Sequence, residues 1–161
     1  MVLMLYTGAA RADAVQLGWA NVVDNRIQYR RQKMKSRGGV LIDIPIHKDL
    51  RRRLEGVSQE QETFLQTRFG RERSANGLGV LMRDWCDAVI DEDDNPVLDE
   101  CTPHGLRKAC ARRLAESGAT PHEIMAVTGH KTLSEVERYT QKASRSGLAD
   151  RAMNKFYDAS E

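Results

Sequence analysis

Two pairs of polar residues in the last third of the chain have residue types and spacings that could do chemistry. In the first pair, His104 and Arg107 lie three residues apart in a stretch with a helical pattern, so both side chains project from one face. The stretch begins at about Pro103, and the N–H groups of a helix N-terminus act on an anion together with a guanidinium. Such a helix end is a good phosphate site, but the isolated pattern by itself is more typical of two unrelated surface side chains.

In the second pair, His130 precedes Tyr139 by nine residues. His130 lies in a short link that follows Gly129, where one predicted helix ends. The capping-box pattern from Thr132 to Glu135 begins the next helix, which carries Tyr139. The sequence thus predicts a histidine held between two well-defined helices and a tyrosine on the second of them.

Neither the histidines nor the cysteines predict a metal site. His104, His122 and His130 lack the i, i+4 relation of a metalloprotease helix, and the link around His130 has no carboxylate, so we expect no metal and no cofactor. The cysteines are Cys86, Cys101 and Cys110. Their odd number, the absence of a CxxC pattern and the lack of a secretory leader indicate a reducing cytoplasm. We expect Cys86 and Cys110 to be small buried hydrophobic residues.

Helical patterns dominate the elements that must position these residues. Helices are predicted over about 1–6, 9–18, 47–54, 74–90, 103–117, 121–129, 132–139 and 147–157. The strands 26–32 and 40–44 form a hairpin with a long basic tip, and 63–67 is predicted as a third short strand. The helix over 74–90 is expected to bury one face, made of Leu78, Met82, Trp85 and Val89. The fold class is α+β and mainly helical, with a small antiparallel sheet beside a helical body.

The composition is that of one globular domain able to bury a core. Of 161 residues, 40% are hydrophobic and 30% are charged, which excludes a membrane span and a disordered polymer. The net charge of +2 gives no general attraction to nucleic acid. However, six basic residues and no acid lie between Arg26 and Arg37, whereas acids gather in 91–100. This asymmetry predicts one anion-facing surface and one solvated loop, with two merely exposed faces as the alternative.

The tyrosine recombinases, or phage-integrase family, are the proteins that this sequence resembles. Residues 104–140 read HGLRKACARRLAESGATPHEIMAVTGHKTLSEVERYT, and the family carries H-x-L-R, then (L/T)-G-H, then a nucleophilic tyrosine nine residues on. The segment 6–19, YTGAARADAVQLGW, resembles the first catalytic box. The hairpin followed by DIPI at 43–46 resembles the strand pair that bears the catalytic lysine. The resemblance covers all 161 residues and implies a single helical catalytic domain over 1–161.

The resemblance implies a specific reaction on DNA. Tyr139 would attack a phosphodiester, forming a 3′-phosphotyrosine and freeing a 5′-hydroxyl that a second strand can use. Arg107 and His130 would stabilise the negative charge that grows on the phosphate. A phenol has a reference pKa of about 10, so it is mostly neutral at pH 7 and needs a proton acceptor, for which His104 is the candidate.

Further cations are implied by the same resemblance. Lys33 would protonate the leaving 5′-oxygen, and Lys35, in the same basic tip, is the alternative. DNA contacts are expected from Lys35, Arg31, Arg37, Lys108 and Lys131. The implied partners are double-stranded DNA, further copies of the chain on that DNA, and an accessory DNA-bending protein, with no role for a membrane.

Two features depart from the family pattern. The first box normally reads T-G-x-R, but Ala10 stands at the arginine position and Arg11 follows it. On a regular helix the next residue is rotated by about 100° around the axis, so Arg11 points in a different direction from the family's arginine. Arg11 is still the candidate for the catalytic arginine. Asp13 matches the acid that braces the family's site. The N-terminal DNA-clamping domain of the family is expected to be absent.

Three functions fit this set of motifs. The favoured one is a site-specific recombinase or integrase, acting in DNA integration and recombination. The alternatives are a type IB topoisomerase-like enzyme and a catalytically impaired DNA-binding or oligomerisation remnant of a mobile-element integrase. In the family, the segment after the nucleophile often docks on a neighbouring protomer. The apolar stripe Leu148, Ala152 and Phe156 suits such docking, but we expect it to pack on the chain's own core.

Overall fold

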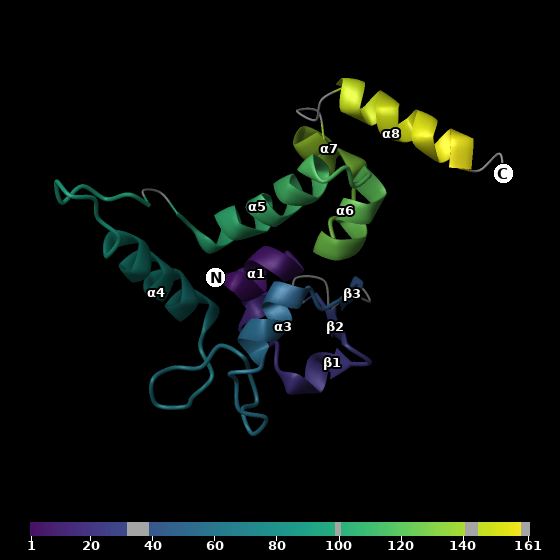
Figure 1. Cartoon of the computed structure of the whole chain (residues 1–161). Coiled ribbons are helices and arrows are strands. Elements are labelled where there is room, and N and C mark those ends of the chain that lie inside the picture. The colour runs from purple at the N-terminus through teal and green to yellow at the C-terminus, as the bar shows by residue number, and fades with distance from the viewer. Residues whose placement is uncertain (32–38, 99–100, 141–144, 159–161) are drawn as a thin grey trace.

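The computed structural model describes residues 1–31, 39–98, 101–140 and 145–158, which form helices and one small sheet (Figure 1). The helices are α1 (Val2–Thr7), α2 (Arg11–Ala14), α3 (Lys48–Leu54), α4 (Ala75–Asp87), α5 (Pro103–Glu116), α6 (Pro121–Thr128), α7 (Leu133–Thr140) and α8 (Arg145–Asp158), with a 3₁₀ turn at Trp19–Asn21. The strands are β1 (Val22–Val23), β2 (Arg26–Arg30) and β3 (Leu41–Pro45). The expected α+β class, mainly helical with a small antiparallel sheet, is confirmed.

The sheet is antiparallel throughout, in the order β1-β2-β3. Both residues of the turn between β1 and β2 have positive φ, as a two-residue hairpin turn requires. Ile27 pairs with Ile44 and Tyr29 with Ile42, and the alternation along each strand buries all four side chains. The predicted hairpin is therefore confirmed.

The segment 63–67 is not the third strand, so that prediction was wrong. Its backbone bonds elsewhere: the Phe64 N–H donates to the Leu17 carbonyl at 2.7 Å, and Gln66 forms an isolated bridge with Glu72. The Phe64 ring packs edge-on against Trp19, with centroids 5.2 Å apart. The apolar pattern of this segment reflects packing against the core rather than strand pairing.

The helix predicted over 9–18 is much shorter, because α2 ends at Ala14. Gly18 is extended, and a Cβ placed there would lie 1.8 Å from the Glu62 carbonyl oxygen. The backbone at Gly18 therefore packs directly against the backbone at Glu62, and the chain no longer follows the path of a helix there. The buried positions expected in this stretch, Ala14, Val15 and Leu17, are nevertheless confirmed.

Helix α4 matches the expected helix but buries a narrower face. Leu78 and Met82 are buried, whereas Trp85 is 43% and Val89 is 42% exposed. The helix ends before Val89, and Cys86, four residues after Met82, takes the next buried position. The expectation that Trp85 and Val89 are buried was therefore wrong, and the expectation for Cys86 is confirmed.

Two clusters of buried side chains hold the helices together. In Figure 1, α1 lies between α5 and α3, and the larger cluster joins α1, α3 and the sheet. The smaller cluster consists of Ala111, Ala115, Ile124 and Val136 and joins α5, α6 and α7. Because α5 carries Arg107 and α7 carries Tyr139, this smaller cluster sets how the two residues face each other.

Helix α8 does not pack as expected. Phe156 is 67% exposed and Ala152 is also exposed, while the side chain of Leu148 lies outside the described part of the chain. Figure 1 places α8 at the edge of the molecule, beyond α7. The buried faces of α5, α6 and α7 already pack on one another, so the prediction that the stripe covers the chain's own core was wrong for Ala152 and Phe156.

Candidate active site

Arg107 is a buried guanidinium at the centre of the candidate site. It lies on the first half of α5 and is only 5% exposed. Its Nη1 donates to the Gly8 carbonyl at the end of α1 and to the Thr128 carbonyl at the end of α6, both at 2.5 Å. Burial is the main cause that lowers its pKa from the usual value, yet an arginine keeps its charge at neutral pH. Arg107 therefore brings a fixed positive charge to the point where α1, α5 and α6 meet.

His130 lies next to this point, in the link after α6. Its Nδ1 is 2.6 Å from Thr128 Oγ1, and that hydroxyl also donates to the Ile124 carbonyl at 2.6 Å. Because the hydroxyl has a single hydrogen, it must accept from the His130 Nδ1–H, which leaves the Nε2 lone pair available. Burial, followed by the charge of Arg107, lowers the pKa of His130 to about 4. The imidazole is therefore neutral at pH 7 and presents an acceptor nitrogen.

Tyr139 is brought close to His130 by helix α7. The two ring centroids are 6.4 Å apart and the ring planes are tilted by 41°. The phenol is half-buried against the small cluster of α5, α6 and α7. Arg138 Nη2 donates to the Tyr139 hydroxyl oxygen at 3.2 Å. The fold thus gathers three of the sequence-predicted residues, Arg107, His130 and Tyr139, from three separate elements.

Arg31, which was expected to contact DNA, is largely buried. Its side chain is only 14% exposed. Nη1 donates to the Gly129 carbonyl, and Nε lies 3.7 Å from Asp13 Oδ2. Asp13 itself is 4% exposed. The end of β2 therefore carries a second guanidinium toward the end of α6, beside Arg107 and His130.

His104, at the start of α5, and Arg11, on α2, line one cavity. Both are exposed, and both line a cavity of about 390 Å³ between α4 and the start of α5. Burial lowers the pKa of His104, and the neighbouring charges of Lys108 and Arg107 lower it further. Arg11 Nη1 lies beside Gly79 of α4. The shift from Ala10 to Arg11 thus directs the arginine toward the cavity that His104 also faces.

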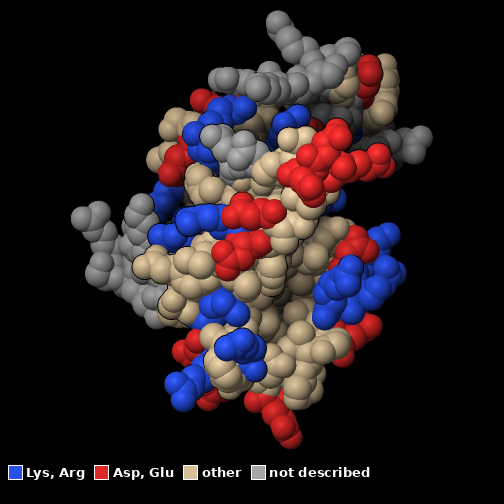
Figure 2. Space-filling model, turned by 90° about the vertical axis from the view of Figure 1, so that its left-hand side faces the viewer, with Lys and Arg blue, Asp and Glu red and all other residues tan. Residues whose placement is uncertain are grey.

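The remaining predicted DNA contacts are partly described. Lys108 on α5 and Lys131 in the link are exposed. Lys33, Lys35 and Arg37 lie outside the described residues. Figure 2, which shows the left-hand side of Figure 1, has basic and acidic side chains intermixed on that face. That face therefore does not offer a surface of one charge sign to an anion.

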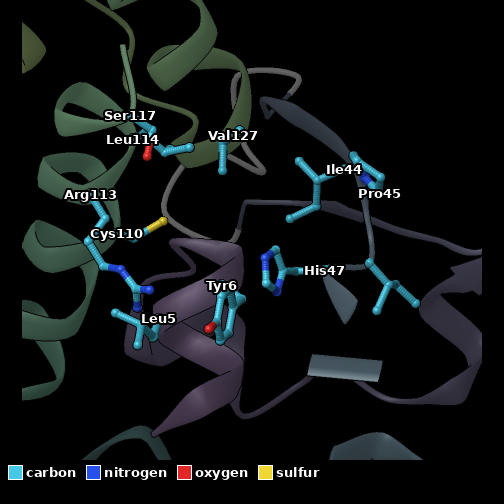
Figure 3. Close-up of a pocket in the computed structure, with 11 residues that line it drawn as sticks. Leu5, Tyr6, Ile44, Pro45, His47, Cys110, Arg113, Leu114, Ser117 and Val127 are labelled. Carbon is cyan, nitrogen blue, oxygen red and sulfur yellow. The ribbon is translucent and has the colours of Figure 1, made fainter. Parts of the chain in front are cut away.

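A second cavity, of about 480 Å³, lies beside the later half of α5 and has a mostly apolar lining (Figure 3). Tyr6 and His47 stack there with ring centroids 4.3 Å apart, and the Arg113 guanidinium lies 5.4 Å from the Tyr6 ring. The Sγ atom of Cys110 points toward this cavity in Figure 3. Of the residues predicted to do chemistry that the structure describes, none lines this cavity.

Sequence reasoning missed Thr128 and the buried position of Arg31. The signal for Thr128 was present, since this threonine opens the T-G-H motif two residues before His130. Nothing local signalled Arg31, whose partners lie far away in the chain. Among the described residues, no three metal-binding side chains gather in one place, and none of the helices has the length and hydropathy of a membrane span.

One family and several related folds emerge when the chain is compared with known proteins. The sequence profile of the Phage integrase family matches residues 1–145. The Tn1549 transposon integrase bound to transposon right-end DNA is similar, with a TM-score of 0.72 and 16% identity over 97% of this chain and 57% of that one. No curated protein matches the sequence.

Two further solved structures share the fold. A lambda integrase dimer bound to a COC′ core site has a TM-score of 0.66 and 23% identity, over 89% of this chain and 51% of that one. XerA recombinase has a TM-score of 0.67 and 17% identity, over 96% of this chain and 56% of that one. The chain therefore spans a little more than half the length of these similar proteins.

Proposed function

The chain belongs to the phage integrase family, and from this we propose that it is a catalytic domain that cuts and rejoins DNA in site-specific recombination. The observation that carries the proposal is the convergence of Arg107, His130 and Tyr139 from α5, the following link and α7. A nucleophile, a neutral imidazole and a buried cation in one place suit attack on a phosphodiester.

In the proposed reaction, the Tyr139 oxygen bonds to a DNA phosphorus atom and the bond from phosphorus to the 5′-oxygen breaks. The DNA strand is then held as a 3′-phosphotyrosine, and the other strand end leaves as a 5′-hydroxyl. The phenol loses a proton and the leaving oxygen gains one. One phosphodiester is exchanged for another, so the reaction needs no cofactor and no ATP. Attack by a 5′-hydroxyl from another strand reverses these steps and completes the exchange.

The contacts of each side chain support a distinct role. The His130 Nε2 lone pair accepts the phenol proton, and the resulting imidazolium then donates to a phosphate oxygen. Arg107 donates to the same phosphate where charge grows, and one such donor contributes about 10²-fold to 10³-fold in rate. His104 is the second acid–base group, and Arg11 reaches the phosphate from the cavity that both line. Lys33 supplies the proton to the leaving oxygen, with Lys35 as the alternative.

DNA and further copies of the chain are the proposed partners. The solved relatives include a DNA-bound dimer, which is a property of lambda integrase. In this chain, Phe156 and Ala152 on α8 are exposed, which supports docking of α8 on a neighbouring protomer. Lys108 and Lys131 are exposed near the candidate site and are proposed to contact the DNA backbone. An accessory DNA-bending protein stays a prediction.

The proposal is tested by trapping the covalent intermediate. A pool of nicked duplexes with randomised sequence is incubated with the full chain at low salt, so that cleavage releases a short fragment and the phosphotyrosine persists. We expect a DNA–protein adduct that survives denaturation in the wild type and in Tyr157→Phe, and none in Tyr139→Phe. Tyr157 is the matched control because it is exposed on α8.

Two results would overturn the proposal. One is a folded wild-type protein that binds DNA but forms no covalent adduct, which would favour a DNA-binding remnant. The other is an adduct that forms equally well in Tyr139→Phe, which would assign the nucleophile elsewhere. Sequencing the DNA recovered from a positive reaction gives the preferred target.

A further inference from the structure

Two guanidinium groups converge on adjacent carbonyls at the end of α6. Arg107 Nη1 donates to the Thr128 carbonyl, and Arg31 Nη1 donates to the Gly129 carbonyl. Arg107 comes from α5 and Arg31 from the end of β2, so their meeting depends on the tertiary fold. Both are largely buried, and the charge of Arg31 acts against that of Arg107. Two like charges side by side destabilise this site unless an anion accompanies them.

The neighbouring groups do not balance this positive charge. Among the described carboxylates, Asp13 is the one that faces Arg31 and acts on Arg107. His130 contributes no charge while it is neutral. Glu135 and Arg138 act on the adjoining His130 with opposite signs, so the two guanidinium groups and Asp13 leave a net charge of about +1 in a mostly buried place. A phosphodiester carries one negative charge and would neutralise it.

The hydrogen bonding of Arg31 is also incomplete. A guanidinium has five N–H donors, and Nη1 makes the one hydrogen bond recorded for this group among the described residues. Nε is buried without a hydrogen-bond partner there, because Asp13 Oδ2 is 3.7 Å away. A buried donor without a partner is costly, so groups of this kind often mark a place where a ligand completes the bonding.

The position of Arg31 is set by packing. The methylene groups of its side chain lie over Gly129, where an added Cβ would be 2.6 Å from Arg31 Cδ. Asp13 holds the guanidinium from the other side. A guanidinium fixed in this way acts on an anion with little loss of side-chain freedom.

We propose that Arg31 is a catalytic residue that binds the scissile DNA phosphate together with Arg107, with Asp13 and the Gly129 carbonyl as its supports. This inference rests on the proposed function, since it takes the phosphate attacked by Tyr139 as the anion. It also adds a cation at the phosphate beyond Arg107 and Arg11, in a chain where Ala10 occupies the usual arginine position.

The test compares two substrates that differ in charge. The nicked duplex recovered from the randomised pool is made once with a normal phosphodiester and once with an uncharged methylphosphonate at the cleaved position. Arg31→Gln removes the cation, and Arg30→Gln is the matched control, because Arg30 precedes it on β2 and is exposed on the opposite face. The rate of covalent adduct formation is measured for each pair.

Arg31→Gln is expected to slow adduct formation about 100-fold on the phosphodiester and less than about tenfold on the methylphosphonate. Arg30→Gln is expected to react like the wild type on both. An equal loss on the two substrates would show that Arg31 is only structural, and no loss would show that it is dispensable. Either result overturns the inference while the wild-type adduct still upholds the proposed function.

A second variant covers the case in which Arg31→Gln does not fold. Arg31→Lys keeps the charge but presents an ammonium in place of the planar group, so a partial loss is expected on the phosphodiester and a smaller one on the methylphosphonate. Thermal melting of each variant shows whether it is folded. If Arg31→Lys loses the same factor on both substrates, the inference is overturned.

Discussion

His130 Nδ1 lies 2.6 Å from Thr128 Oγ1, two residues earlier in the chain. The same hydroxyl donates its only hydrogen to the Ile124 carbonyl, so it holds His130 in the tautomer with the proton on Nδ1. Thr128 is fully buried at the last position of α6, and its side chain reaches back one turn of the helix to the Ile124 carbonyl. One hydroxyl therefore determines which nitrogen of His130 carries the proton.

Thr128→Val tests this positioning role. The variant keeps the shape of the side chain but removes the hydroxyl that accepts from the His130 Nδ1–H. Losing this hydrogen bond weakens the orientation of the imidazole by about 1 kcal/mol, so adduct formation should slow about fivefold. Thr128→Ser should restore the rate, because serine keeps the hydroxyl. The pH profile of the reaction is recorded alongside, since a changed tautomer moves the pKa of His130. An unchanged rate and profile in Thr128→Val would mean that the hydroxyl does not orient the imidazole.

The pKa of His130 predicts acid sensitivity of the fold. Burial lowers this pKa from 6.5 to about 4, so between these values the unfolded chain binds more protons than the folded one. The contribution of neutral His130 to stability is therefore complete above about pH 6.5 and is lost as the pH falls through about 4. Urea unfolding at about pH 7.5 and about pH 4.5 measures the loss.

His130→Gln provides the control, because glutamine does not titrate. The difference in the free energy of unfolding between the two pH values should be smaller in this variant than in the wild type. The pKa of the imidazole can also be followed directly by NMR. An ordinary pKa of His130 in the free protein would contradict the lowered pKa and the acid sensitivity that follows from it.

Arg107 is expected to stabilise the fold as well as the reaction. Arg107→Ala leaves the buried Gly8 and Thr128 carbonyls without their donor, which should lower the free energy of unfolding by about 2–4 kcal/mol. Arg112→Ala on the same helix breaks only an exposed pair with Glu116 and should change it by less than about 0.5 kcal/mol. Denaturant titration of the two variants compares them, and equal effects would argue against the buried bonds.

Gly129 is expected to tolerate no side chain. Its φ is +68°, and an added Cβ would meet Arg31 Cδ at 2.6 Å and Ile42 Cδ1 at 2.7 Å. Gly70 has a similar φ of +72° with no atom within 4 Å, so Gly70→Ala isolates the backbone strain of about 1 kcal/mol. Gly129→Ala should lose about 2 kcal/mol more, from the contacts alone, in chemical unfolding. Similar losses in both variants would indicate that Arg31 and Ile42 move aside easily.

Local sequence signals were enough to predict most elements. Helix α6 begins at the capping box Thr120–Glu123 and ends at the left-handed Gly129, as expected, because capping depends on residues within one turn. The hairpin of β2 and β3 follows from alternation along the two strands. The motif spacing also predicted the family and the convergence of Arg107, His130 and Tyr139, since these residues lie on α5, in the link after α6 and on α7.

Tertiary packing alone decided the features that rest on distant contacts. Arg31 meets Gly129 across 98 residues, and Arg107 meets Gly8 across 99, which no local pattern encodes. The same holds for Trp85 and Phe156, whose apolar spacing predicted burial but which are 43% and 67% exposed. The sequence by itself therefore determined which residue types are available for the proposed chemistry. Which cations lie beside His130 depends on how β2, α5 and the end of α6 pack together, because only that packing sets the burial and the partners of each guanidinium.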